Sequence, residues 1–366
     1  MKKKSYLIIL IILACTQLTG CSYFPQKEDF SKVISGEASQ EAKVLENELQ
    51  QMREEVADYF YYQQLDTDEE RRVYLQLANG LRTFKQQITI DRVDDETYTR
   101  AFFSVANDFP EYYWMTDAMR DGIDYQDLSE PDYPLQVEEE SEKIATLAQS
   151  IVSQAPKDHV YDTVKFFYEY IIQHTDYNLA ALSDSQISWD NQSIKSVLLD
   201  NSSVCAGYSR TFQYLCKLAG IEAVYVSGNV TGTNGETIEH AWNLVKIDQQ
   251  YYGVDSTWGD PVFEEAMGSQ AQSTISYDYL CVPDSILYRN RVADVDLLSY
   301  WGTEYPYTER PLAYPSCTDN ALNYYVQQGT YFENFDEELV VQTVSNLYQT
   351  GQRRIACQFS NQAALN

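Results

Sequence analysis

HAWNLVKI at positions 240–247 and QYYGVDSTW at 250–258 are the two runs that decide this fold. Their residues alternate with a period of two, which is typical of β-strands. Because only Asp248-Gln249 separates them, we predict an antiparallel hairpin with a tight connection. An even-numbered connection opposes residues whose position numbers sum to an odd value. His240 and Asp255 then face the same side of the hairpin, one diagonal step apart.

A helix is predicted upstream of the hairpin, from about Cys205 to Ala219. Turn and cap formers precede it at 200–203, and Gly220 is its expected C-terminal stop. One face of this helix carries apolar or small residues at Cys205, Ser209, Phe212 and Cys216. We therefore expect the helix to be buried and rigid.

We interpret Cys205, His240 and Asp255 as nucleophile, base and orienter. The free amide groups and the positive dipole end at a helix start favour a thiolate and can bind an oxyanion. A carboxylate at Asp255 can hold one imidazole nitrogen of His240 while the other faces the thiol. A lone cysteine or histidine is more often structural, so the prediction rests on the three residues occurring together and in order.

The sequence around these residues resembles the transglutaminase-like superfamily, a branch of papain-like folds. The resemblance is carried by VCAGYS at 204–209, HAWN at 240–243 and YGVDSTWGDP at 252–261. It implies an α+β fold in which the helix carrying the cysteine packs on an antiparallel sheet, with small α+β domains on either side. The chain departs from the expected pattern at Gly259, where an acidic residue should precede Asp260.

Aromatic residues near the motifs are candidates for lining a substrate cleft. We assign Tyr177, Tyr208, Trp242 and Trp258 to this group, and Trp258, beside Asp255, is also a candidate to shield the triad from water. Packing in the core accounts for each of them equally well.

The first residues predict export and lipidation. Lys2, Lys3 and Lys4 precede an apolar run at 5–15 that is too short for a membrane span. Leu18-Thr19-Gly20-Cys21 follows and resembles the bacterial lipobox, which implies cleavage before Cys21 and acylation of its thiol, as with palmitate. The alternative is an ordinary signal peptide with a chance cysteine. We expect a lipoprotein anchored to the outer face of the cell membrane, and the flanking domains resemble those of exported Gram-positive proteins.

Composition and pattern divide the chain into segments: a signal peptide at 1–20, a tether at 21–40, an N-terminal α+β domain at 41–130, the transglutaminase-like domain at 135–300, and a C-terminal α/β unit at 305–366. Strands are predicted at 88–90, 112–114 and 323–326. A helix capped by Asp336 and a final strand near 355–359 are predicted in the last unit. That unit ends on AALN, which resembles the opening of a helix, as in an incomplete unit.

The net charge of −29 argues against nucleic acid as a partner. Three histidines and no CxxC pair argue against a structural zinc site, and no phosphate-binding glycine loop occurs. We expect no metal and no organic cofactor.

The predicted activity is that of a cell-envelope thiol enzyme acting on amide bonds through a thioester. Its substrate would be a peptide, a protein or a cell-wall amide. With water as acceptor it is a hydrolase of the cysteine protease or amidase kind, and with an amine it is a transglutaminase. The alternative is a surface module without catalysis that binds peptide or cell-wall fragments.

Overall fold

The computed structural model describes residues 27–85, 88–115, 133–184, 187–188, 191–266, 268, 274–297 and 310–360. The chain divides into two compact units, Met1–Gln50 and Gln51–Asn366. The predicted signal peptide and Cys21 lie outside the described residues. Within the described ranges, no helix has the length and apolar character needed to cross a membrane.

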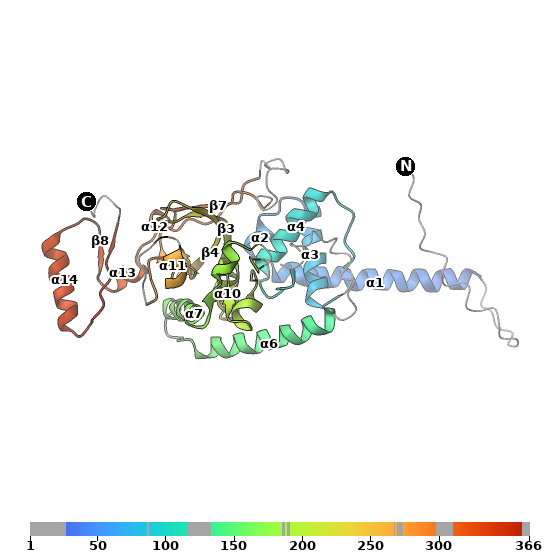
Figure 1. The fold of residues 1–366 in the computed structure, drawn as a ribbon. Helices are drawn as coiled ribbons and strands as arrows, with labels where there is room; N and C mark the ends of the chain where they lie inside the picture. Colours follow the sequence, from blue (N-terminus) through green and yellow to red (C-terminus); the bar gives the residue numbers. More distant parts are fainter. Residues whose placement is uncertain are drawn as a thin grey trace. The chain divides into compact units, whose positions relative to one another are not determined.

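The described helices have the following bounds (Figure 1): α1 (Lys27–Glu55), α2 (Phe60–Gln63), α3 (Asp68–Arg82), α4 (Asp95–Asp108), α6 (Tyr133–Gln154), α7 (Val160–His174), η1 (Leu179–Leu182), α9 (Ile194–Leu198), α10 (Cys205–Leu218), α11 (Pro261–Ala266), α12 (Asp284–Leu287), α13 (Tyr324–Gln327) and α14 (Glu337–Gln349). The strands are β1 (Asp176–Tyr177), β2 (Ser202–Ser203), β3 (Ala223–Thr231), β4 (Thr237–Ile247), β5 (Gln250–Val254), β6 (Leu280–Val282), β7 (Arg291–Ala293), β8 (Tyr331–Phe332) and β9 (Gln358–Phe359).

Helix α1 covers part of the segment predicted as a tether, because the chain is helical from Lys27 onward. The physical reason is composition. Lys and Glu, which are good helix formers, recur through residues 27–40, although this polar stretch lacks an apolar period.

Helices α2, α3 and α4 form the N-terminal part of the second unit. A capping box is present at the start of α3, where the Glu70 amide donates to the Thr67 hydroxyl at 3.1 Å and the Thr67 amide donates to the Glu70 carboxylate at 3.1 Å. The described residues at 88–90 and 112–114 form no strand, so both predictions were wrong. At 112–114 the tyrosine and tryptophan rings instead pack against one another.

Hydrogen bonds between α4 and α10 hold the helix that carries Cys205 in place. Arg210 donates to the carbonyl of Ala106, and Gln213 donates to the carbonyl of Asn107 at 2.8 Å. Residues three apart share one helix face, and the last carbonyls of a helix have no partner within it. The two side chains therefore satisfy the end of α4 while they hold α10 in place.

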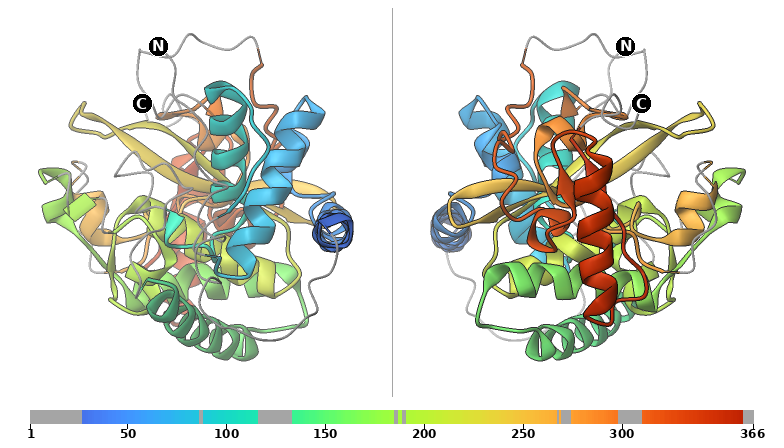
Figure 2. Two further views of the ribbon diagram at one scale, coloured as in Figure 1. Left: turned by 90° about the vertical axis from the view of Figure 1, so that its right-hand side faces the viewer. Right: turned by 90° about the vertical axis from the view of Figure 1, so that its left-hand side faces the viewer.

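A five-stranded sheet with the order β6-β5-β4-β3-β7 is the centre of the second unit, and all neighbouring strands are antiparallel. Helix α10 contacts β3 and β4 as well as helices α6, α7 and α9. Figure 1 shows α6, α7 and α10 on one side of the sheet, and Figure 2 gives two further views of the ribbon. The fold is thus α+β, with the helix that carries Cys205 packed on an antiparallel sheet, as predicted.

The β4–β5 hairpin has the predicted register. Asn243 lies opposite Val254, so opposed position numbers sum to an odd value. Asp248 and Gln249 both have positive φ angles, 49° and 68°. Two such residues form the turn whose twist suits a two-residue hairpin.

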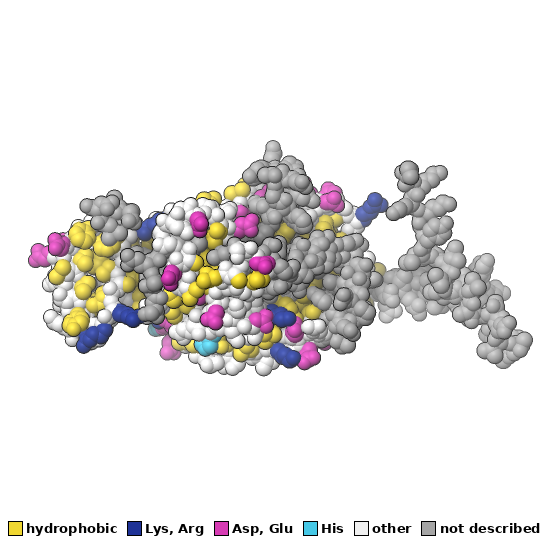
Figure 3. All heavy atoms as spheres, in the orientation of Figure 1, with side chains coloured by type: hydrophobic (Ala, Val, Ile, Leu, Met, Phe, Trp, Pro, Cys, Tyr) yellow, Lys and Arg dark blue, Asp and Glu magenta, His cyan; other side chains and the backbone are white. Residues whose placement is uncertain are grey.

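The C-terminal part differs from the prediction at 323–326, where the chain forms helix α13 instead of a strand. The Asn323 side chain caps this helix by accepting from the Tyr325 amide at 2.9 Å. Asp336 caps α14 as predicted, accepting from the Leu339 amide at 3.1 Å. No residue of α14 is buried, and hydrophobic side chains gather over this part of the surface in Figure 3.

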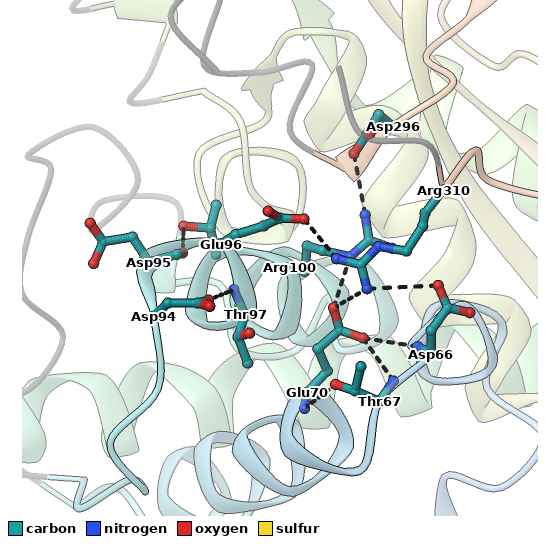
Figure 4. Close-up of polar contacts among 11 residues, drawn as sticks. Asp66, Thr67, Glu70, Asp94, Asp95, Glu96, Thr97, Arg100, Asp296 and Arg310 are labelled. Carbon is teal, nitrogen blue, oxygen red and sulfur yellow. Dashed lines mark hydrogen bonds and ion pairs between the residues drawn. The ribbon is translucent and has the colours of Figure 1, made fainter. Parts of the chain in front are cut away.

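A group of charges with a buried centre and one partly exposed member, the helical ion cluster, connects α3 and α4 with the chain that follows β7 (Figure 4). It consists of Glu70, Arg100, Asp296 and Arg310. The Glu70 carboxylate accepts from Arg100 at 3.1 Å and from Arg310 at 2.7 Å, and Arg100 reaches Asp296 at 3.4 Å. The side chains of Glu70 and Arg100 are both 1% exposed.

Candidate active site

Cys205 is the first residue of α10 and is half-buried. Its predecessor Val204 has an extended backbone, and no side chain caps the helix. No side chain therefore competes with an anion for the first amide groups and the positive dipole end. Cys205 packs against Ala206, Tyr225 and Ala241, a small apolar cluster contributed by α10, β3 and β4.

Gly207 explains how the start of α10 can approach the preceding turn. A Cβ atom at this position would lie 2.0 Å from the Ser203 hydroxyl and 2.9 Å from the Ser196 hydroxyl. Those two hydroxyls hydrogen-bond to each other at 2.7 Å. The glycine in the VCAGYS motif therefore permits the close packing that places Cys205.

His240 lies on β4 with its side chain buried. Its Nε2 lies 2.9 Å from Oδ2 of Asp255. Because an ionised carboxylate only accepts, Nε2 carries the proton of this hydrogen bond. Nδ1 is buried and has no hydrogen-bond partner among the described residues. The imidazole stacks on the ring of Phe263, with centroids 5.4 Å apart.

Asp255 follows β5 and is fully buried. Its Oδ1 accepts from the Trp258 amide at 3.0 Å, and its Oδ2 accepts from both His240 and Arg291. Three donors thus surround one carboxylate. The predicted pairing of His240 with Asp255 is present in the structure, whereas no pattern in the sequence indicates Arg291 beside them.

The pKa values of Asp255 and His240 are shifted in opposite directions. Burial alone would raise the pKa of Asp255, but the charges of His240 and Arg291 outweigh it and hold that pKa at about 2. Burial alone would lower the pKa of His240, but Asp255 and the nearby Cys205 outweigh it and raise that pKa to about 9. Strong shifts at a cleft are typical of functional sites.

A cleft of about 700 Å³ opens beside these residues. Cys205 and His240 both line it, and so does Tyr177. Carboxylates of Asp184, Glu239 and Asp294 belong to its described lining. The cleft is a concave site of the size usual for small ligands or peptide segments.

The aromatic candidates separate into two groups. Tyr177 lines the cleft, as predicted, and burial raises its pKa. Tyr208 and Trp242 are fully buried instead of lining it. The Tyr208 hydroxyl donates to the Asp260 carboxylate at 2.8 Å and so holds α10. Trp258 is also absent from the lining of the cleft: it is 5% exposed and lies edge-on to His240 at 6.1 Å, where it covers the imidazole.

Gly259, where the sequence departs from the expected acidic residue, has a steric explanation. A Cβ atom there would lie 2.2 Å from the hydroxyl of Tyr168 and 2.6 Å from Ile172. Tyr168 is itself fixed, because its hydroxyl donates to the Ser276 carbonyl at 2.7 Å. An acidic side chain has no room beside this tyrosine.

Among the described residues, no group of three or more His, Cys, Asp and Glu side chains could hold a metal ion. The chemistry that this site can perform with its own residues is nucleophilic attack by a thiol, with proton transfer by an imidazole that a carboxylate orients.

Comparisons with known proteins show what the chain is similar to. Residues 145–256 match the model of the transglutaminase-like superfamily. The human kyphoscoliosis peptidase is 28% identical over 159 residues, which cover 40% of this chain and 23% of that protein. The mouse protein is 29% identical over 122 residues, covering 31% and 18%. The chain thus spans less than a quarter of either relative. A solved structure of a TGase is 19% identical with a TM-score of 0.30, covering 41% of this chain and 38% of that one.

Proposed function

The chain contains a transglutaminase-like domain, and on this basis we propose that it is a cysteine enzyme acting on amide bonds of peptides or proteins, anchored outside the cell membrane. The observation that carries the proposal is the imidazole of His240. Its Nε2 is held by Asp255, and its Nδ1 is without a partner among the described residues, in a cleft that Cys205 also lines. An imidazole held on one side and open on the other is suited to exchange a proton with a thiol.

The first half of the reaction forms a thioester. Nδ1 of His240 takes the proton of the Cys205 thiol, and the sulfur attacks the amide carbon. The amide groups at the start of α10 face the developing oxyanion. The tetrahedral intermediate then collapses, the carbon–nitrogen bond breaks, and the imidazolium gives its proton to the leaving amine. Asp255 stabilises the imidazolium while it exists.

The second half depends on the acceptor. Water or a second amine gives its proton to His240 and attacks the thioester carbon, and the Cys205 sulfur leaves and recovers that proton. Water yields a carboxylic acid, and an amine yields a new amide. The two relatives named as peptidases favour water.

Alkylation of Cys205 tests whether the site is active. The full chain is treated with iodoacetamide over a range of pH, and mass spectrometry follows the peptide that contains Cys205. We expect this thiol to react faster than an ordinary thiol and to lose that advantage in His240→Ala. The matched control is His174→Ala, at an exposed histidine. A Cys205 that reacts like an ordinary thiol, and no differently in His240→Ala, would leave only a surface module that binds without catalysis.

The fate of the bond separates hydrolysis from transfer. Cell-wall peptides and surface proteins are incubated with the wild type and with Cys205→Ala, and their masses are compared. We expect shorter peptides carrying new carboxyl ends with the wild type alone. New amide links between peptides would assign the transferase reaction instead.

The anchoring part of the proposal rests on the lipobox-like sequence before Cys21. We expect the wild type to partition with the membrane and Cys21→Ala to appear in the medium. A Cys21→Ala variant that remains in the membrane fraction would contradict lipid anchoring at this residue.

A further inference from the structure

Arg291 is a buried cation at the edge of the sheet. It is the first residue of β7 and lies opposite Val230 of β3. Its side chain is fully buried. The guanidinium lies 4.1 Å from the ring centroid of Tyr279, 5.4 Å from that of Trp242 and 5.5 Å from that of Trp258. Aromatic faces replace water around this cation, as in other cation–π sites.

One oxygen connects Arg291 with the proposed catalytic residues. Oδ2 of Asp255 accepts from Nη1 of Arg291 and also from Nε2 of His240. Oδ1 is occupied by the Trp258 amide. The carboxylate is therefore fixed on both oxygens, and the oxygen that orients the imidazole is the one that the guanidinium holds.

The charges of the three side chains have a direct consequence. With a neutral imidazole, Arg291 and Asp255 balance each other. With an imidazolium, the three side chains carry a net positive charge. In a buried site, where charges are weakly screened, the guanidinium therefore opposes protonation of His240.

We propose that Arg291 is a positioning residue of this site, which fixes the Asp255 carboxylate against Nε2 of His240 and limits how strongly that carboxylate retains the imidazolium proton. The inference rests on the proposed function. In the reaction, Arg291 makes His240 a readier acid toward the leaving amine. It acts through Asp255 and touches no reacting atom.

Within the described part of the chain, the other titratable groups that face His240 and Asp255 carry no positive charge, so Arg291 is the permanent cation beside this pair. Cys205 of α10 faces His240. Tyr177 of β1 and Tyr279, before β6, face Asp255. Burial raises the pKa of both tyrosines, so each is uncharged at neutral pH.

The test measures the titration of His240 directly. The chain has three histidines, so histidine-labelled protein gives few imidazole signals, and His240→Gln identifies the one of interest. In Arg291→Met we expect the midpoint of the His240 titration to rise by about one pH unit, because a neighbouring cation is lost. A more basic His240 also favours transfer of the thiol proton, so we expect Cys205 to be alkylated at least as fast as in the wild type. A midpoint unchanged in folded Arg291→Met would overturn the proposal.

Arg291→Lys keeps the inference testable if the methionine variant does not fold. A lysine retains the buried charge but not the planar guanidinium. We expect the His240 midpoint to stay within about 0.3 pH units of the wild type, since charge sets it. A rise of a full unit in Arg291→Lys would contradict the assigned role.

Arg100→Met is the matched control, because Arg100 is equally buried and also pairs with a buried carboxylate. It should lower the melting temperature and leave the His240 midpoint unchanged. Failure of the two proposals remains distinguishable. If alkylation of Cys205 does not depend on His240, the proposed function fails. If it does depend on His240 while Arg291→Met leaves the midpoint in place, only the role of Arg291 is wrong.

Discussion

The molecule contains two buried ion clusters that use the same chemistry to different ends. In the helical ion cluster, Arg100 meets Glu70 and Asp296. In what we call the triad ion cluster, Arg291 and His240 share Asp255. Both pair a guanidinium with a carboxylate inside the protein.

The difference lies in what each cluster leaves unpaired. Among the described residues, no buried side-chain atom of the helical ion cluster lacks a hydrogen bond, whereas Nδ1 of His240 and Nη2 of Arg291 both lack one. The helical ion cluster is closed and has no titrating imidazole. The triad ion cluster has an open nitrogen beside a cleft. A closed cluster can only stabilise, and an open one can exchange protons.

The largest effect is expected for Asp255→Asn. The imidazole loses its charged partner, so alkylation of Cys205 should slow on the order of a hundredfold. Arg291 also becomes an unpaired buried charge, which should cost about 3–5 kcal/mol in the free energy of unfolding. Alkylation kinetics and urea denaturation measure the two losses. Asp58→Asn, at an exposed carboxylate, is the control. An undiminished rate would show that the triad ion cluster has only a structural role.

Glu70→Gln disrupts the helical ion cluster and leaves the triad ion cluster intact. It should cost about 3 kcal/mol of unfolding free energy, because Arg100 loses its closest countercharge. Glutamine can retain the capping box with Thr67, so the loss reports the ion pair. The folded variant should alkylate Cys205 within about twofold of the wild-type rate, since the uncoupled sites contribute independently. A much slower rate would mean that the helical ion cluster governs the site through the chain after β7.

The elements that the sequence predicts best are those whose local signals agree with their burial. The β4–β5 hairpin combines alternation with a two-residue connection, and the Cys205 helix combines cap formers with a periodic face. The failures at 112–114 and 323–326 have a common cause. Tyrosine and tryptophan favour strands on average, but here their rings pack in aromatic clusters that only the tertiary structure brings together.

The same distinction applies to the site. His240 and Asp255 could be placed together because the register of one hairpin decides it. Arg291 lies 36 residues beyond Asp255 on a three-residue strand, and its position depends on the pairing of β7 with β3. No local pattern contains that information. Trp242 was assigned to the cleft from its motif, but its side chain packs under Arg291 instead.

Stability should depend on pH through His240 in a way that the helical ion cluster cannot reproduce. The pKa of His240 is about 9 in the folded protein and about 6.5 when unfolded. The proton-bound form is therefore favoured by folding, and this contribution is present below pH 6.5 and lost as pH rises through 9. It amounts to roughly 3 kcal/mol.

The difference in unfolding free energy between wild type and His240→Gln should shrink by about that amount between pH 6.5 and 9.5. Taking the difference cancels the contribution of Asp108, whose pKa burial raises to about 7. Asp255 contributes at acidic pH. Because its pKa in the folded protein is about 2, below the ordinary value, its ionised form adds stability that is present above pH 4 and is lost as pH falls through 2. If this difference in unfolding free energy stays constant from pH 6.5 to 9.5, then His240 does not titrate with a raised pKa in the folded protein.

The smallest effect is expected at the outer arm of the helical ion cluster. Arg310 also contacts Glu70, at 2.7 Å, but its side chain is 30% exposed. Water screens such a pair, so Arg310→Met should cost only about 0.5 kcal/mol in urea denaturation, well below the loss in Arg100→Met. The combination with Glu96→Gln, which removes its exposed partner, isolates the pairwise term. The contrary outcome is that Arg310→Met lowers the unfolding free energy as much as Arg100→Met. In that case burial of the cation does not determine how much each arginine of the helical ion cluster contributes, and the partly exposed Arg310 is as important to the cluster as Arg100.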